Sequence, residues 1–481
     1  MKLALIFNPY SYHIHEENLR IVQKFFGRFP PLSLAWVASI AEKHGHKVII
    51  IDAMNLGLSQ RQTVDILKDF NPDVLGFTIT TYAYQETLSW IKYIKKEIPK
   101  PVLIGGFGVA LYPIETCTPA EIDFGFIGHT HETLPKFLNE LEGNRNFSTV
   151  SGLIYKDNAK IKLIPPDNTH FDFDSLPNPA RHLLPNEIYS SFPTQRKNFT
   201  VMVTSMGCPY KCIFCTNTGT PHCPRSTEVV LREIEECYSR YGIGEIDFFD
   251  YEFTIDRQRV IDICNGIISR RLDLLWSCRC RVDSVDKELL LKMRKAGCDR
   301  IYFGIESGIQ EILDALNKDI TLKQILETVN ITKETGIKIL GFFMIGTPGE
   351  TKKTVRKTIQ FAKSLGLDFV QFSKFTAKPA SSLYKKLSKE TNTDYWKDYI
   401  LGKTEAQVLP RPWTTLSQQE IDILVKKAYI YFHSQPLFLL KSVLGIRSFS
   451  ELKKKFLAYL EMLFCQESIS KKAKNFDIYR D

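Results

Sequence analysis

The sequence lacks any long apolar run. No stretch approaches the roughly 18 consecutive apolar residues that a helix needs to span a bilayer. The apolar start of the chain, residues 1–7, is too short for a signal peptide and is not followed by a small-residue cleavage site. We therefore expect a soluble, cytoplasmic protein whose first strand covers residues 2–7.

The sequence also lacks a regular frame of cysteines. It contains 11 cysteines, and apart from one close triplet they are scattered, which favours a reducing compartment over a disulfide scaffold. The net charge of +9 is modest for 481 residues and identifies no class of partner. A chain of this length is too long for one compact core, so we expect two or three domains.

The triplet is the most informative feature that is present. Cys208, Cys212 and Cys215 stand in a Cys-x-x-x-Cys-x-x-Cys run, shortly after an apolar stretch over 199–203 that is typical of a strand end. Three close thiolates suit an iron-sulfur cluster, which needs four ligands. One iron would then stay open for a substrate or a cosubstrate.

A closed zinc site is the alternative interpretation of the triplet. It would need a fourth ligand nearby, which His222 or Cys223 could supply. Zinc sites usually show paired Cys-x-x-Cys units, and here a single triplet stands alone. The cluster is therefore the favoured hypothesis.

At this point the sequence resembles the radical S-adenosylmethionine (radical SAM) superfamily. Its cysteine loop has this spacing, with an aromatic residue before the third cysteine, which Phe214 matches. The resemblance implies a [4Fe-4S] cluster held by the three cysteines and S-adenosylmethionine bound beside it. Met206 is a departure, because many relatives have arginine just before the Gly-Cys-Pro string.

The first part of the chain, to about residue 145, alternates β-rich and amphipathic stretches. This alternation predicts a doubly wound parallel sheet, on which ligands bind at the carboxyl ends of the strands. The expected strands are 2–7, 47–52, 74–78, 102–104 and 124–127, and the clearest helices are 32–44 and 84–96.

The strand ends in this part carry small hydroxyl residues and glycines. Thr78 and Thr80, followed at a distance by Gly105-Gly106, resemble the cobalamin-binding domain family, in which such residues line the channel for the nucleotide tail. Gly128 ends a further strand and joins this predicted cofactor site. Without the resemblance, a generic flavodoxin-like domain with ordinary tight turns would explain the same glycines.

The resemblance is incomplete at one motif. Many cobalamin domains carry Asp-x-His-x-x-Gly, whose histidine binds cobalt, and here Asp52 to Gly57 has Met54 at the histidine position. Radical SAM relatives with cobalamin domains commonly depart in this way. His129 and His131 are the alternative ligands, but an isolated loop histidine is more often an ordinary polar residue.

The second half also alternates strand-like and helix-like runs, with polar residues at the strand ends, which is typical of a βα barrel. These strings resemble the cobalamin-dependent radical SAM class, and the resemblance implies that they hold the amine, carboxylate and hydroxyls of S-adenosylmethionine. For any one of them, a helix cap or a surface ion pair is the alternative. The candidate residues are Asp250, Glu252, Arg281, Glu306, Ser307 and Gly346.

After about residue 402 the pattern turns helical, with amphipathic stretches over 417–432 and 449–464. Basic and large apolar residues mix in the second stretch. Packing on its own domain with the lysines in water is the favoured interpretation of such a helix. The alternatives are that it lies on a membrane surface as a peripheral contact or closes over the mouth of the barrel.

We therefore predict an α/β protein: a doubly wound, flavodoxin-like cobalamin-binding domain (1–145), a connector (146–194), a radical SAM partial βα barrel (195–402) and a helical domain (403–481). The resemblance implies a methyltransferase that uses a [4Fe-4S] cluster, S-adenosylmethionine and cobalamin to methylate an unactivated carbon of a small molecule or lipid. It also implies an electron donor such as flavodoxin or ferredoxin, and we expect no nucleic-acid partner.

Two other functions stay open at this point. One is an oxidative cyclisation or rearrangement without methyl transfer, as in relatives that act on tetrapyrroles. The other is a corrinoid sensor with a structural metal cluster, which would not need the acidic and arginine strand ends. A methylthiotransferase is disfavoured because the sequence shows neither a second N-terminal cysteine cluster nor an evident C-terminal RNA-binding module.

Overall fold

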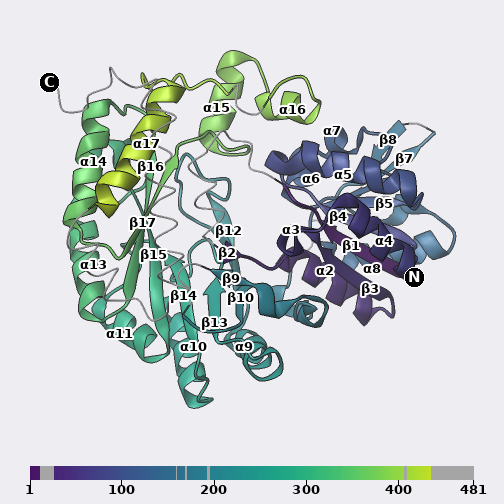
Figure 1. Cartoon of the computed structure of the whole chain (residues 1–481), viewed down its shortest axis with the longest axis horizontal. Helices are drawn as coiled ribbons and strands as arrows, with labels where there is room; N and C mark the ends of the chain where they lie inside the picture. Colours follow the sequence, from purple (N-terminus) through teal and green to yellow (C-terminus); the bar gives the residue numbers. More distant parts are fainter. Residues whose placement is uncertain (11–26, 159, 168–170, 192–194, 406–408, 435–481) are drawn as a thin grey trace.

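The computed structural model describes residues 1–10, 27–158, 160–167, 171–191, 195–405 and 409–434. They form two large sheets, each with its own helices, that lie on opposite sides of the molecule in Figure 1. Within these residues, no helix is long and apolar enough to cross a membrane.

The N-terminal sheet has seven strands in the order β3-β1-β4-β5-β6-β7-β8, and the first five are parallel. This confirms the predicted doubly wound sheet. The strands are β1 Lys2–Phe7, β3 Lys47–Asp52, β4 Val74–Thr78, β5 Val102–Gly105, β6 Phe124–Phe126, β7 Leu153–Asp157 and β8 Lys160–Leu163.

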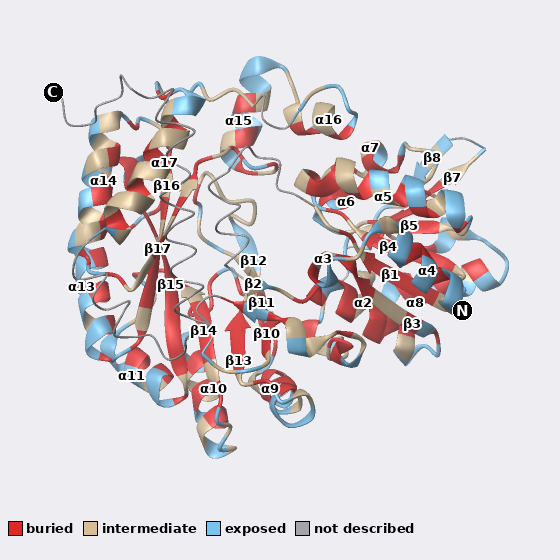
Figure 2. Cartoon of the chain, in the orientation of Figure 1, coloured by how far each residue is buried: buried red, intermediate tan, exposed pale blue. Residues whose placement is uncertain are grey.

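Helices cover both faces of this sheet. One face packs against α2 (Leu32–Lys43) and α8 (Thr130–Glu142), and the other against α4 (Gln60–Phe70) and α5 (Tyr84–Glu97). The strands are buried on both sides, which explains why they are almost continuously apolar rather than alternating (Figure 2). The remaining helices here are the short α3 (Ala53–Leu56), α6 (Phe107–Leu111) and α7 (Pro113–Cys117).

The stretch that we expected to be a connector contributes to this sheet. β7 pairs antiparallel with β6, and β8 pairs antiparallel with β7, so the sheet continues past residue 145. The other described residues of this stretch form short 3-10 turns and β9 (Ser190–Ser191), which pairs with β2 (Gly27–Arg28).

The second sheet has six parallel strands in the order β10-β13-β14-β15-β16-β17, each joined to the next by a helix or helices. It curves into the predicted partial barrel (Figure 1). The strands are β10 Phe199–Met202, β13 Glu245–Phe248, β14 Leu275–Cys280, β15 Cys298–Glu306, β16 Lys338–Ile345 and β17 Phe369–Lys374. The helices are α9 Thr227–Tyr241, α10 Arg257–Ser269, α11 Lys287–Lys295, α12 Gln310–Ala315, α13 Leu322–Glu334 and α14 Lys352–Ser364.

The helices pack on the convex face of this sheet. In β17, Val370 and Phe372 are buried in the helix-covered core, whereas Gln371 and Ser373 are half-buried. Because side chains alternate between the two faces of a strand, the half-buried set points to the concave face. That face therefore carries side chains that a ligand can reach.

Two helices after the barrel bridge to the N-terminal part. α15 (Ser382–Thr391) and α16 (Tyr395–Ile400) share a hydrophobic core with the first sheet. The side-chain amide of Gln85 on α5 donates to the carbonyls of Tyr399 and Ile400 at 2.8 and 2.9 Å, and Lys397 lies 2.6 Å from Glu115. The cobalamin-type domain is thus held against the barrel.

The helix expected over 417–432 is present as α17 (Gln418–His433). Its apolar side chains belong to the barrel core, where it packs against β17 and α14, so it extends the barrel rather than forming a core of its own. The second amphipathic stretch, 449–464, lies outside the described residues, and with it the predicted membrane contact.

Candidate active site

The cysteine triplet lies in a loop at the carboxyl edge of the barrel sheet. Cys208 is the last residue of β11 (Ser205–Cys208), which forms a small hairpin with β12 (Thr220–Pro224). Gly207 has a φ of +80°, and a Cβ there would lie 1.8 Å from the Pro221 carbonyl oxygen, so this turn requires glycine. Between the strands, the Tyr210 carbonyl accepts from the Gly219 N–H at 2.8 Å.

Asp250 holds the start of this loop. Its carboxylate, at the end of β13, accepts from the N–H and hydroxyl of Thr204 at 2.6 and 2.5 Å and from the Ser205 hydroxyl at 2.7 Å. Arg259 donates to the Thr204 carbonyl at 2.8 Å from the other side. Asp250 is fully buried, and its carboxylate serves to hold the start of the loop in place.

The three thiols are close enough to influence one another. Burial raises the pKa of Cys208, and the charges of Cys215 and Cys212 raise that pKa further. Within the described ranges, no three His, Cys, Asp or Glu side chains are placed to bind one metal ion. In a cluster each thiolate binds a different iron, so its ligands stand farther apart than the ligands of a single ion. The set fits a cluster in number and chemistry.

The candidate fourth ligands for zinc have other neighbours. Cys223 donates a weak hydrogen bond to the Phe171 carbonyl, and the nearby charges that raise its pKa, after burial, are Asp172 and Asp174. The neighbouring charges of His222 are those of Arg259, Asp250 and Asp256. None of these neighbours is a cysteine of the triplet.

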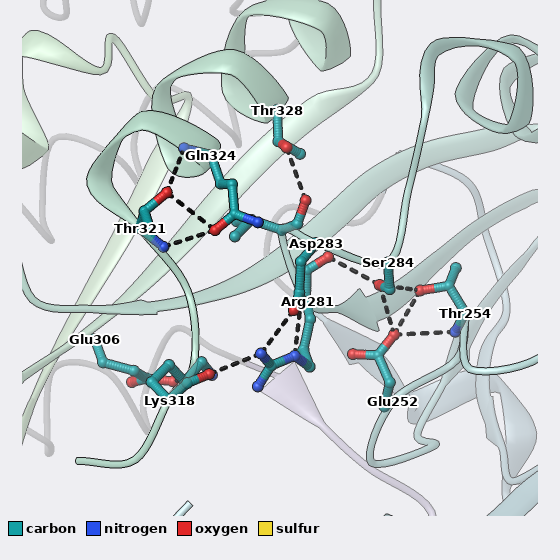
Figure 3. Close-up of polar contacts among 11 residues, drawn as sticks. Glu252, Thr254, Arg281, Asp283, Ser284, Glu306, Lys318, Thr321, Gln324 and Thr328 are labelled. Carbon is teal, nitrogen blue, oxygen red and sulfur yellow. Dashed lines mark hydrogen bonds and ion pairs between the residues drawn. The ribbon is translucent and has the colours of Figure 1, made fainter. Parts of the chain in front are cut away.

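Glu252 and Arg281 lie beside the cysteine loop, close enough for their charges to act on Cys208 and Cys212. Figure 3 shows the polar contacts of both side chains. The Glu252 carboxylate accepts from the N–H of Thr254 at 3.1 Å and from the hydroxyl of Ser284 at 3.0 Å. Burial raises the pKa of Glu252, and these donors oppose the shift. The carboxylate is therefore held in a fixed position.

Arg281 is oriented by Asp283 and by the loop itself. Its Nε and Nη2 atoms each donate to Asp283 at 2.8 Å, and Nη2 also donates to the Lys318 carbonyl at 2.7 Å. The guanidinium lies 3.9 Å from the centre of the Tyr210 ring. Its Nη1 atom donates to no residue in the described part of the chain, which leaves a cationic donor for a ligand.

Lys318 is a functional candidate that the sequence did not reveal. Its ammonium group lies 3.0 Å from Glu306 at the end of β15, and both side chains are buried (Figure 3). Glu306 has a φ of +68°, which is uncommon for a residue with a side chain. Burial raises the pKa of Cys212, and the charges of Lys318 and Arg281 act against that shift. The pair thus lies beside the predicted cluster.

The other barrel candidates have structural contacts. The Ser307 hydroxyl is 3.1 Å from that of Thr358, and Phe214 packs edge to face on Phe375 at 6.2 Å. The Gly346 N–H donates to Glu350 at 2.6 Å, and its carbonyl accepts from Trp413.

The N-terminal candidates meet at the ends of β4 and β5. Gly106 has a φ of +104°, and a Cβ there would lie 2.8 Å from the Ile79 carbonyl oxygen and 3.0 Å from the Thr78 hydroxyl. Gly105 faces open space, with nothing within 4 Å of a built Cβ. Thr80 is exposed. The backbone conformation at position 106 therefore requires glycine, whereas a side chain at position 105 would enter open space.

Two further N-terminal features follow strands of the first sheet, one after β6 and one after β3. Gly128 lies two residues after β6, has a φ of +81° and precedes His129, whose ring stacks on Phe171 at 3.7 Å. Burial lowers the pKa of His129. Separately, Met54 lines a cavity of about 360 Å³ after β3. Met54 thus borders open space at the carboxyl edge of the sheet.

Comparison with known proteins decides the family. Residues 202–362 match the radical SAM superfamily, and residues 20–138 match the B12 binding domain. An uncharacterized methyltransferase of Pyrococcus horikoshii is 34% identical over 422 residues, covering 86% of this chain and 90% of its own. The chain belongs to the cobalamin-binding radical SAM enzymes.

A further relative and a solved structure are also similar to this chain. The anaerobic magnesium-protoporphyrin IX monomethyl ester cyclase of Rubrivivax gelatinosus is 28% identical over 373 residues, covering 75% of this chain and 67% of its own. The solved structure of OxsB with aqua-cobalamin and S-adenosylmethionine bound shares the fold, with a TM-score of 0.70, 18% identity, and coverage of 98% and 75%.

The family confirms several predictions from the sequence. The protein is an enzyme, its fold is a cobalamin-binding domain followed by a radical SAM partial barrel, and its cofactors are a [4Fe-4S] cluster, S-adenosylmethionine and cobalamin.

Proposed function

We propose that this enzyme transfers a methyl group to an unactivated carbon of a small molecule or lipid. Its methyltransferase relative, which the chain matches over most of its length, supports methyl transfer. When bound, the cluster with S-adenosylmethionine supplies the radical that takes hydrogen from the substrate, and cobalamin supplies the methyl group. The electron for the cluster comes from a small donor such as flavodoxin or ferredoxin.

The observation that carries this proposal is the position of the cysteine loop against the cobalamin-type domain. Cys223 in β12, the strand paired with β11, donates to the Phe171 carbonyl, and the Phe171 ring stacks on His129 after β6. This contact brings the hairpin that carries Cys208 next to the strand end that carries Gly128, which supports two cofactor sites that face one another. A site closed between two domains also keeps water from the reacting carbon.

Individual residues of the chain have distinct roles in holding the cofactors. Cys208, Cys212 and Cys215 hold the cluster, and Asp250 positions their loop rather than binding the cosubstrate. Arg281 binds the carboxylate of S-adenosylmethionine through Nη1.

The other cofactor contacts come from carboxylates and strand ends. Glu252 and Glu306 receive the amine and the ribose hydroxyls of S-adenosylmethionine, because the contacts of both carboxyl groups hold them in fixed positions beside the cysteine loop. The remaining predicted contacts are Phe214, Ser307 and Gly346 for S-adenosylmethionine, and Thr78, Thr80, Gly105, Gly106 and Gly128 for cobalamin.

The test measures how S-adenosylmethionine is consumed. Reconstituted protein is incubated without oxygen with cell extract, a reductant and S-adenosylmethionine labelled in its methyl group. A methyltransferase uses one molecule to make the radical and another to supply the methyl, so deoxyadenosine and S-adenosylhomocysteine should form in comparable amounts. A cyclase would make deoxyadenosine almost alone, and that result would replace methyl transfer with oxidative cyclisation.

A further inference from the structure

One arginine on the concave face of the barrel has a role in none of the sites described above. Arg279 lies on β14 between Cys278 and Cys280, which are buried in the core under the helices. Its own side chain is 28% exposed. Since neighbours in a strand point to opposite faces, Arg279 points to the concave face, about 7 Å along the strand from Arg281.

Arg279 is held in one orientation by a buried carboxylate. Its Nη1 atom donates to Asp247 at 3.1 Å and to the Phe248 carbonyl at 2.9 Å, and its Nη2 atom donates to the other Asp247 oxygen at 3.3 Å. Asp247 is only 1% exposed. These hydrogen bonds to Asp247 and Phe248 thus hold the guanidinium in one orientation.

The hydrogen bonds leave one edge of the guanidinium open. An arginine has five N–H groups, and three of them are used by Asp247 and Phe248. The remaining two are on Nε and Nη2, and no other described residue accepts from them. They form the parallel pair that binds a carboxylate or phosphate through two oxygens. Arg281 uses the same edge to bind Asp283.

Aromatic rings lie beside the Arg279 guanidinium. The guanidinium lies 4.0 Å from the centre of the Phe249 ring and 5.0 Å from that of Tyr302. The Tyr302 ring in turn stacks on Phe342 at 5.9 Å with an angle of 11°. Phe249 also contacts Phe29, which follows β2 of the N-terminal part, so this group faces the cobalamin-type domain.

The charge around Arg279 is balanced before any ligand binds. Asp247 is shared by Arg279 and Arg300, and Arg300 lies 3.3 Å from Glu245. An anion would therefore be recognised by the two open N–H groups of a side chain that is 28% exposed. A charge excess is not needed, because two aimed donors flanked by apolar rings favour an oxyanion on an apolar body.

We propose that Arg279 binds an anionic group of the substrate, a carboxylate or a phosphate, while Phe249, Tyr302 and Phe342 pack against the apolar part next to it. This rests on the proposed function, because it places the substrate on the concave face below S-adenosylmethionine. The substrate is then an amphipathic organic acid or phosphate ester rather than a neutral lipid.

The test measures binding of small probes and does not depend on turnover. Benzoate, phenyl phosphate and the neutral benzamide are titrated by saturation-transfer NMR into reconstituted protein saturated with S-adenosylmethionine. At least one anionic probe should bind tenfold or more tightly than benzamide. Arg279→Lys keeps a cation beside Asp247 but removes the paired donors, so it should weaken the anionic probe about ten- to a hundredfold and leave benzamide unchanged.

Two further variants complete the design. Arg257→Lys alters an exposed arginine on α10, at the outside of the barrel, and should change nothing. Phe249→Leu should weaken benzamide and the anionic probe alike. The proposal is overturned if Arg279→Lys binds the anionic probe as well as the unaltered protein does, or if benzamide binds equally well. Absence of methylated product with intact probe binding would instead reject the proposed function.

Discussion

The Asp250 carboxylate accepts hydrogen bonds from both the backbone N–H and the hydroxyl of Thr204, at 2.6 and 2.5 Å. Thr204 stands four residues before Cys208, at the end of β10, whereas Asp250 follows the neighbouring strand β13. The two strand ends are thereby tied together where the cysteine loop begins. Cluster assembly should depend on this tie.

We predict that Asp250→Ala lowers the iron content of the reconstituted protein. The change leaves the Thr204 and Ser205 donors without their acceptor, and an unsatisfied buried donor costs about 1–3 kcal/mol. Iron per chain and the free energy of unfolding are the measurements. Asp256→Ala is the control, because it removes a helix cap on α10 at a similar cost of about 1 kcal/mol. Equal iron contents in the two variants would contradict the prediction.

Replacing Cys208, Cys212 and Cys215 together by alanine should abolish both the cluster absorbance and the formation of deoxyadenosine. The unaltered protein should bind about four irons per chain through these thiolates. A matched variant replaces Cys223, whose thiol is directed to Phe171, and should keep iron and activity. Iron and activity retained by the triple variant would rule out this assignment. Zinc bound tightly by the unaltered protein in place of iron would favour the structural zinc site.

Glu350 should make stability depend on pH. Burial raises the pKa of Glu350 to about 7 from an ordinary 4.5, and its carboxylate accepts from the N–H groups of Gly346 and Thr347. Between these two pH values the folded state keeps a proton that the unfolded state releases. Its stabilising contribution is complete below about pH 4.5 and is lost as the pH rises through 7.

Glu350→Gln removes this titration and keeps the shape of the neutral side chain. From pH 5 to pH 8, the unaltered protein should therefore lose about 2–3 kcal/mol relative to the variant. Urea unfolding of both proteins at the two pH values measures the difference. Parallel pH dependences would show that the folded-state pKa of Glu350 is ordinary.

Arg281→Ala should reduce deoxyadenosine and S-adenosylhomocysteine together. If its Nη1 atom holds the cosubstrate carboxylate, its loss costs about 1.5–3 kcal/mol, or ten- to a hundredfold in binding. The Michaelis constant for S-adenosylmethionine should rise while the cluster absorbance stays. The control is Arg270→Ala, which breaks surface ion pairs with Glu228 and Glu235. A fall in only one of the two products would reject the shared role.

Features that depend on a few neighbouring residues could be predicted from the sequence, whereas contacts between residues far apart in the chain could not. The apolar strands and the cysteine spacing were predictable because each is a pattern within a few residues. Lys318 was not, since it meets Glu306 only after α12 folds back. Asp250 was expected to bind the cosubstrate, because its strand-end position is visible in sequence and its hydrogen bonds to Thr204 are not.

The two glycines proposed to line the cobalamin channel, Gly105 and Gly106, differ in the space around them. Tryptophan at Gly106 would block the channel, but Gly106 has a positive φ and lies against the Ile79 backbone, so any side chain there strains the fold. Gly105 has open space instead. Gly105→Trp should therefore fill the channel with the strands intact, and Gly105→Ala, which adds one methyl group, should fill little of it.

We predict that hydroxocobalamin uptake falls at least tenfold in Gly105→Trp and stays near the unaltered level in Gly105→Ala. Uptake is measured by absorbance after gel filtration, and the iron content reports whether the barrel is intact. Full uptake by the tryptophan variant would show that the nucleotide tail lies elsewhere. In protein that has taken up cobalamin, electron paramagnetic resonance of cobalt(II) should show no nitrogen ligand from His129 or His131, because the His129 ring is stacked on Phe171.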